Sequence, residues 1–126
     1  MKQRTFTEPL IDTPSSYPIQ PMRELFEAVL KCKTVDECAK FFRDLLTMSE
    51  ITEFANRWQV VKLLQKHESY AVIAQKLNIS TATVTRVAHW LHNGMGGYQL
   101  IADRMFEKSH IDKPKHHRLH GKRWLA

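Results

Sequence analysis

A short polar stretch in the second half of the chain carries the side chains best suited to chemistry with nucleic acid. Short hydroxyl and methyl groups at a helix N-terminus can contact base edges and thymine methyls, while arginine and lysine suit guanine or phosphate. The residues predicted to contact DNA on this basis are Lys76, Ser80, Thr81, Ala82, Thr83, Thr85 and Arg86. The alternative is an ordinary helical hairpin with a threonine-rich face that is only solvated.

The elements that would present these side chains follow from an apolar pattern between Tyr70 and Leu91. Ala74 is small enough for close helix packing, and Asn78 tolerates the left-handed conformation of a tight turn. Ser80 can then cap a second helix with its hydroxyl. Apolar residues stand at the spacing that packs two short helices on each other and on the domain, at Ile73, Leu77, Ile79, Val84 and Val87. The pattern predicts a DNA-binding helix-turn-helix.

Histidines and cysteines are the residues that could bind a metal. His89 and His92 have helical spacing, but no acidic or thiol ligand accompanies them, which favours a solvated or phosphate-facing role. Cys32 and Cys38 lack the spacing of a zinc site and lie in an apolar pattern, which predicts reduced, buried thiols. The sequence therefore predicts no metal site. It also contains no catalytic arrangement, so the chain is not expected to be an enzyme.

The net charge of +6 is unevenly distributed along the chain. Residues 57–92 carry five basic side chains against Glu68 alone, and residues 108–126 carry six against Asp112, whereas residues 21–56 sum to −2. A basic motif and a basic tail favour a partner rich in phosphate, and double-stranded DNA is the partner expected. A basic surface that binds nothing is the alternative.

Helical periodicity predicts an all-α fold of six helices, in which helices four and five form the helix-turn-helix. Residues 1–21 hold four prolines and no helical period, so they are expected to form a flexible arm. The first helix should begin at Met22, and the sixth should cover about residues 98–108. The helical domain is thus assigned to residues 22–108, and residues 109–126 form a basic, histidine-rich tail.

Local signals in the sequence mark several helix ends. Thr34 with Glu37, and Thr47 with Glu50, form capping-box patterns that should begin the second and third helices. Gly94 follows the fifth helix and should end it.

The first three expected helices hold more large apolar side chains than a thin helical layer can hide. Among them are Phe26, Phe41, Phe42, Phe54 and Trp58. A homodimer in which the helices of two chains interleave would bury these side chains. It would also place two recognition helices about one turn of DNA apart.

No stretch of the sequence suggests a membrane protein. The N-terminus lacks an apolar signal core, and no apolar run approaches the ~20 residues that cross a bilayer. No membrane partner is expected, and a cytoplasmic location is predicted.

Five segments together resemble the Trp-repressor superfamily, and within it the Trp-repressor-like branch known as YerC/YecD. The resemblance covers residues 22–107 and implies an intertwined, all-helical dimer that binds palindromic operator DNA and regulates transcription as a repressor. The segments are LTMSE at 46–50, NRWQVV at 56–61, STATVTR at 80–86, LHNG at 91–94 and ADR at 102–104.

The resemblance also implies a candidate effector pocket, because two arginines of the Trp repressor sandwich the indole of its tryptophan corepressor. The second arginine matches Arg86, and the first falls close to Arg57, although the stricter match is one or two positions later. Val87 replaces a glycine that leaves room for the ligand, and Val87 and Trp90 should fill or reshape the pocket. The arginines could instead bind phosphate or pair with acidic residues of the long helix. No cofactor is required; a small-molecule corepressor is compatible with these residues, and tryptophan is disfavoured.

Two other functions fit parts of the sequence. The helical hairpin could belong to a protein-interaction adaptor whose basic tail docks on acidic partners, although a docking helix usually exposes apolar anchors where this one has threonines. The histidine-rich tail could instead make the protein a metal-responsive regulator.

Overall fold

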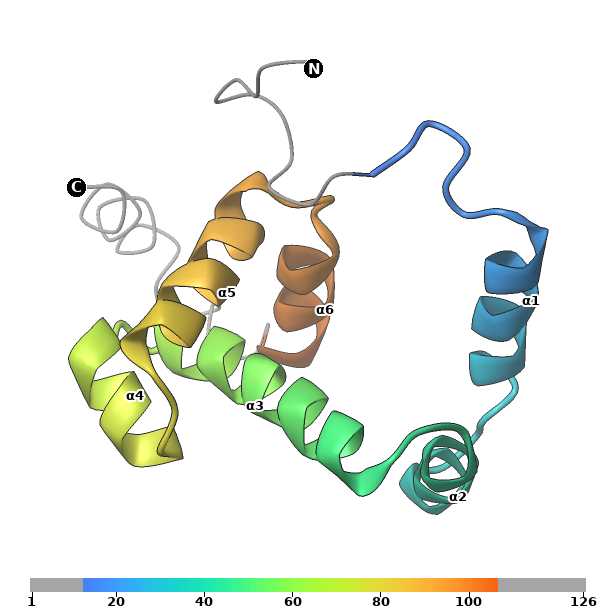
Figure 1. Ribbon diagram of the computed structural model, residues 1–126, viewed down its shortest axis with the longest axis horizontal. Helices are drawn as coiled ribbons and strands as arrows, with labels where there is room; N and C mark the ends of the chain where they lie inside the picture. Colours follow the sequence, from blue (N-terminus) through green and yellow to red (C-terminus); the bar gives the residue numbers. More distant parts are fainter. Residues whose placement is uncertain (1–12, 107–126) are drawn as a thin grey trace. The chain divides into compact units, whose positions relative to one another are not determined.

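The computed structural model describes residues 13–106, and these residues form six helices and no strand (Figure 1). The helices are α1 (Gln20–Val29), α2 (Val35–Leu45), α3 (Met48–Gln65), α4 (Tyr70–Leu77), α5 (Thr81–Asn93) and α6 (Gly97–Phe106). The predicted all-α fold of six helices is confirmed. The described chain divides into two compact units, residues 13–56 and residues 57–106, and α3 runs through the boundary between them.

The first unit has no buried side chain in residues 13–56. Its ring contacts are local: Tyr17 meets Phe26 edge-on with centroids 6.3 Å apart, and Phe41 meets Phe42 at 5.7 Å. Large apolar side chains remain exposed throughout the unit, at Tyr17, Ile19, Met22, Phe26, Leu30, Val35, Leu45, Met48 and Phe54. Helices as short as α1 and α2 are marginal in water without packing, so this unit lacks the usual source of helix stability within one chain.

The helix ends of the first unit are determined by capping. The Thr34 hydroxyl accepts from the Glu37 N–H at 3.1 Å, and the Glu37 carboxylate accepts from the Lys33 N–H at 2.9 Å. At α3 the Thr47 hydroxyl accepts from the Glu50 N–H at 3.1 Å, and the Glu50 carboxylate accepts from the Thr47 N–H at 2.9 Å. Both predicted helix starts are confirmed, because each cap satisfies backbone donors that no carbonyl of the helix can reach.

Two expectations for the first unit were wrong. Helix α1 begins at Gln20 and not at Met22, because Pro21 falls in the first turn, where its missing N–H has no partner to lose. Cys32 and Cys38 are free thiols as predicted, but they are half-buried and not buried. The unit has no core of its own in which they could lie.

The second unit is built on a core to which four helices contribute. Its side chains are apolar and mostly branched, which suits close packing between helices. They are Val60, Val61 and Leu64 of α3, Ile73 and Ala74 of α4, Val84, Val87, Ala88 and Leu91 of α5, and Ala102 of α6. This core fixes α4 and α5 against each other and against the second half of α3 (Figure 1).

Three aromatic rings attach α6 to the second half of α3. The Trp58 ring stacks on Phe106 with centroids 6.1 Å apart and lies 6.3 Å from the Tyr98 ring. Partial burial raises the pKa of the Tyr98 hydroxyl, and the nearby Arg57 guanidinium opposes that shift. The described part of α6 ends at Phe106, so the predicted extension to residue 108 and the tail at 109–126 lie outside the described residues.

Helix α5 ends at Asn93, and Gly94 follows it as predicted. Gly94 has φ −85° and ψ −151°, so its backbone is not in the left-handed conformation common after helices. A Cβ at Gly94 would lie 2.5 Å from the Trp90 carbonyl oxygen, so only a hydrogen atom fits there.

Among the helices of residues 13–106, none combines the length and the hydropathy needed to cross a membrane.

Candidate nucleic-acid interface

Helices α4 and α5 are joined by a turn with a defined hydrogen-bond pattern. Asn78 is left-handed, with φ 55° and ψ 49°, as the sequence predicted. The Asn78 N–H donates to the Gln75 carbonyl at 3.3 Å, and the Ile79 N–H donates to the Ala74 carbonyl at 3.0 Å. This Schellman pattern satisfies the last carbonyls of α4 and reverses the chain sharply. Leu77 and Ile79 pack at the edge of the core, so both sides of the turn are anchored.

Ser80 caps α5 as expected, and its cap also engages Thr83. The Ser80 hydroxyl accepts from the Thr83 N–H at 3.1 Å, and the two hydroxyl oxygens lie 3.0 Å apart. The Thr83 side chain is half-buried, whereas Thr81 is exposed. The Thr83 hydroxyl therefore has a partner within the protein, and its contact with DNA remains a prediction.

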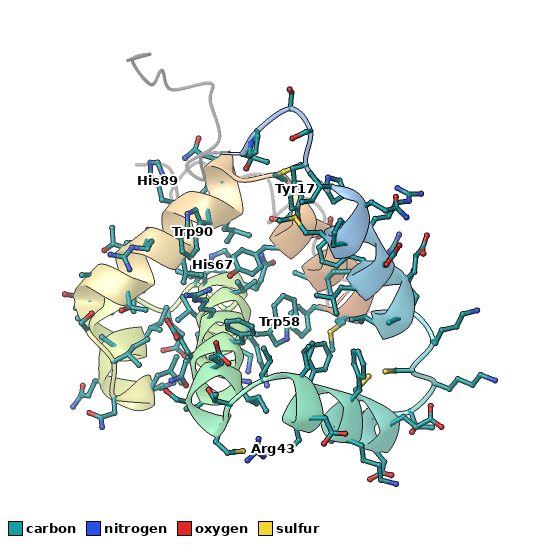
Figure 2. The ribbon with its side chains drawn as sticks, turned by 45° about the vertical axis from the view of Figure 1, so that its right-hand side comes forward. Tyr17, Arg43, Trp58, His67, His89 and Trp90 are labelled. Carbon is teal, nitrogen blue, oxygen red and sulfur yellow. The ribbon has the colours of Figure 1, made fainter. Side chains whose placement is uncertain are left out.

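One face of α5 is polar and open to solvent. Ala82, Thr85, Arg86 and His89 are exposed and recur at spacings of three and four residues. Such spacing gathers side chains on one side of a helix, here opposite the buried valines and leucine of the core. His89 projects from the outer side of α5 (Figure 2). Sequence reasoning weighed His89 as a metal ligand against a solvated or phosphate-facing role, but did not name it among the DNA contacts. Its spacing from Arg86 could have added it to this face.

Lys76 lies in the last turn of α4, and its ammonium group is paired with Glu68. The Lys76 Nζ is 3.0 Å from the Glu68 Oε2, and the two side chains are 52% and 26% exposed respectively. The sequence analysis did not foresee this pair. The signal was available, because Glu68 is the single acidic residue in the strongly basic segment 57–92.

The residues of the candidate effector pocket have distinct environments. The Arg57 guanidinium carbon lies 5.5 Å from the centroid of the Trp90 ring, which is cation–π geometry. Trp90 projects from α5 (Figure 2) and is half-buried. Val87 is 1% exposed and belongs to the core, while Arg86 is exposed. The structure thus brings Arg57 and Trp90 together, as a contact between α3 and α5, and Val87 packs among apolar residues.

The histidines on α5 show no metal-binding arrangement. Within residues 13–106 no group of three histidine, cysteine or acidic side chains could hold a metal ion. Partial burial lowers the pKa of His92, and the neighbouring His89 lowers it further. The histidine-rich tail lies outside the described residues.

The family model described as Trp repressor protein matches residues 20–106, which include all six helices. The chain belongs to the Trp repressor family. It is also 37% identical over 84 residues to the uncharacterised protein YerC of Bacillus subtilis, a match that covers 67% of this chain and 81% of YerC. The resemblance to the YerC branch is therefore confirmed.

Two solved structures are similar to this chain. One is a TrpR-like protein from Eubacterium eligens, with a TM-score of 0.69, 37% identity, and coverage of 73% of this chain and 95% of the other. The second is a candidate Trp repressor from Staphylococcus aureus, with a TM-score of 0.68, 37% identity, and coverage of 74% and 95%. Membership of this family indicates a DNA-binding regulator.

Proposed function

We propose that this protein is a sequence-specific transcriptional regulator of the repressor type, which reads palindromic operator DNA as a homodimer. The observation that carries the proposal is the exposed polar face of α5, held on an α4–α5 hairpin whose inner face belongs to the core. In this proposal α4 and α5 form a helix-turn-helix, and α5 enters the major groove.

Contacts to bases are assigned to the exposed face of α5. The Ala82 methyl and the Thr85 side chain suit thymine methyls and base edges, and Arg86 suits guanine or phosphate. Thr81 lies at the helix start, where a hydroxyl can reach a phosphate or a base. Ser80 and Thr83 hold the helix start through their mutual hydrogen bonds and act chiefly by positioning.

The homodimer is supported by the exposed apolar side chains of residues 13–56. Phe26 is 42% exposed, Phe54 46% and Leu30 82% within one chain, a pattern that monomeric domains avoid over a whole unit. A second copy of the chain is the partner that matches the operator symmetry, because a two-fold dimer presents two copies of α5 to two half-sites. A cytoplasmic location remains a prediction from the sequence.

We further propose that DNA binding requires no corepressor. The Arg57 guanidinium already faces the Trp90 ring, and Val87 is packed in the core. An indole ligand placed against Arg57 would have to compete with the Trp90 ring for the guanidinium. Added tryptophan is expected to leave the dissociation constant for DNA unchanged. A tightening of more than about tenfold, equivalent to about 1.4 kcal/mol, would contradict this.

The test of the main proposal is selection of genomic fragments by the purified full-length protein at near-physiological salt, followed by sequencing. An enriched inverted repeat with half-sites about one helical turn apart is the expected result. Salt-sensitive binding without an enriched site would contradict sequence-specific binding and would indicate non-specific attraction to DNA phosphates. If no fragment is retained, the proposal fails and the protein-interaction adaptor becomes the leading function.

A matched pair of arginine variants sharpens the test. Arg86→Ala should lose most discrimination between the enriched site and random DNA, since a good arginine–base contact contributes about 1–3 kcal/mol. Arg104→Ala changes an arginine that is also exposed in the second unit but lies on α6, and it should retain the discrimination. If both variants lost the same amount of discrimination between the enriched site and random DNA, α5 would not be the helix that contacts the bases.

A further inference from the structure

The backbone that carries Glu68 is tightly fixed at the end of α3. His67 is left-handed with φ 64°, and its N–H donates to the Leu64 carbonyl at 2.9 Å. The Glu68 N–H donates to the Leu63 carbonyl at 3.2 Å. These two bonds form a Schellman pattern, and Ser69 directly afterwards caps α4 by accepting from the Val72 N–H at 3.2 Å. The backbone of Glu68 is therefore held in a fixed position between α3 and α4.

Lys76 is held just as firmly at the other end of α4. It lies in the last turn of α4, two residues before Asn78, and Ile73 and Ala74 of the same helix are buried. Eight positions separate the two partners, yet their charged atoms are 3.0 Å apart. The Glu68 side chain is about a quarter exposed, so its carboxylate is shielded more than the ammonium group it binds.

This pair matters because of where it lies. Lys76 is five residues before Thr81 and is the lysine nearest to the start of α5, while Glu68 is the single acid in residues 57–92. A carboxylate on Lys76 removes one free cation from the surface that would meet DNA. Exposed ion pairs are weak, so a well-placed phosphate can displace the carboxylate from the lysine.

We propose that Glu68 weakens DNA binding by competing with DNA phosphate for the ammonium group of Lys76. In a loosely held, non-specific complex the lysine remains on Glu68 and adds nothing to binding. When the base contacts of α5 fix the duplex, a phosphate is held against Lys76 and displaces Glu68. Glu68 thus lowers affinity for both kinds of DNA, and the operator complex loses the free energy of the ion pair that its phosphate must break. This inference rests on the proposed function.

Lys76→Gln tests the inference in the full-length protein. The probes are a labelled random-sequence duplex and the inverted repeat obtained by genomic selection, each titrated at several salt concentrations. Lys76→Gln should weaken operator binding about threefold to fivefold and change random-duplex binding by less than about twofold. An equal loss on both duplexes would overturn the inference, because it would mean that the lysine is free in both complexes.

Glu68→Gln tests the same idea from the other side. This isosteric, neutral variant should bind the random duplex about threefold to fivefold tighter, with a log–log salt slope about 0.9 steeper, because one more phosphate contact is made. The gain should disappear in the Lys76→Gln, Glu68→Gln double variant. A gain that persists there would show that Glu68 repels phosphate directly, and no gain in either background would also overturn the inference.

The controls separate this inference from the function on which it rests. Wild-type protein that binds neither duplex would overturn the proposed function, and the role of Glu68 with it. Wild-type protein that binds both, with variants that behave like it, would overturn the role of Glu68 alone. Thermal melting of each variant checks folding. If Glu68→Gln is unfolded, Lys76→Gln still decides the matter, because that change lies on the exposed partner.

Discussion

Residues 13–56 and residues 57–106 have similar helical content but differ in what holds their helices. The second unit has a core of ten buried apolar residues, whereas the first has none among its described residues. The first unit relies on helix caps and i,i+4 pairs such as Arg23–Glu27 and Asp36–Lys40, each of which contributes only a few tenths of a kcal/mol. The second unit is therefore stabilised by its own core, whereas the first exposes apolar side chains that the proposed homodimer would cover.

The largest effect is expected from a charge placed in the first unit. Phe54→Glu should convert the proposed homodimer into a monomer, because a carboxylate in an apolar interface is costly to desolvate. Light scattering at micromolar concentration measures the change in mass. Val72→Glu, on an exposed position of α4, is the matched control and should leave the mass unchanged. A wild-type protein that is already monomeric would refute the dimer. It would also refute the idea that a second copy covers the exposed apolar side chains of the first unit.

The second-largest effect is expected when a buried side chain of the second unit is shortened. Ile73 is fully buried, so Ile73→Ala should lower the free energy of unfolding by about 2–5 kcal/mol. Denaturant unfolding measures this loss. Val35→Ala, at a position that is 87% exposed in one chain, should cost far less within the monomer. Similar losses for the two variants would contradict the contrast between the units.

The end of α5 offers a steric test within the second unit. Gly94→Ala would place a Cβ 2.5 Å from the Trp90 carbonyl oxygen, and the strain should cost about 1–3 kcal/mol. Gly97→Ala is the control, because no atom lies within 4 Å of its added Cβ. That control should be neutral or slightly stabilising in thermal melting. Equal melting temperatures for the two variants would show that the chain relaxes around Gly94.

The smallest expected effect is a pH dependence that arises in the second unit alone. The folded protein lowers the pKa of His92 by burial, so below about pH 6.5 the unfolded chain binds more protons than the folded one. The contribution of His92 to stability is therefore complete above about pH 6.5 and is lost as the pH falls below it. His92→Gln should reduce the acid-side fall in melting temperature, and His89→Gln should reduce it less. No change in His92→Gln would exclude this histidine as the cause.

Sequence reasoning succeeded where structure depends on residues close together in the chain. The caps at Thr34, Thr47 and Ser80 and the left-handed Asn78 were all predicted, because each involves residues at most five positions apart. Apolar periodicity likewise identified Ile73, Val84 and Val87, all of which are buried.

Sequence reasoning failed where a side chain meets a partner brought to it by a chain reversal. The Glu68–Lys76 pair depends on the left-handed His67. The contact between Arg57 and Trp90 depends on how α5 crosses α3, and only the family resemblance had placed these two residues in one candidate pocket. Neither distance follows from spacing along one helix.

The sequence by itself determined the six helices, the capped starts of α2, α3 and α5, the basic character of the second half and the family. Hydrogen bonds within one turn, side-chain periodicity and charge are fixed by neighbouring residues, and they need no further information. Only the tertiary structure decided which apolar residues are buried in one chain, and which cation of the candidate interface is already paired. Burial and long-range pairing depend on how separate helices pack, and that packing is a property of the whole core.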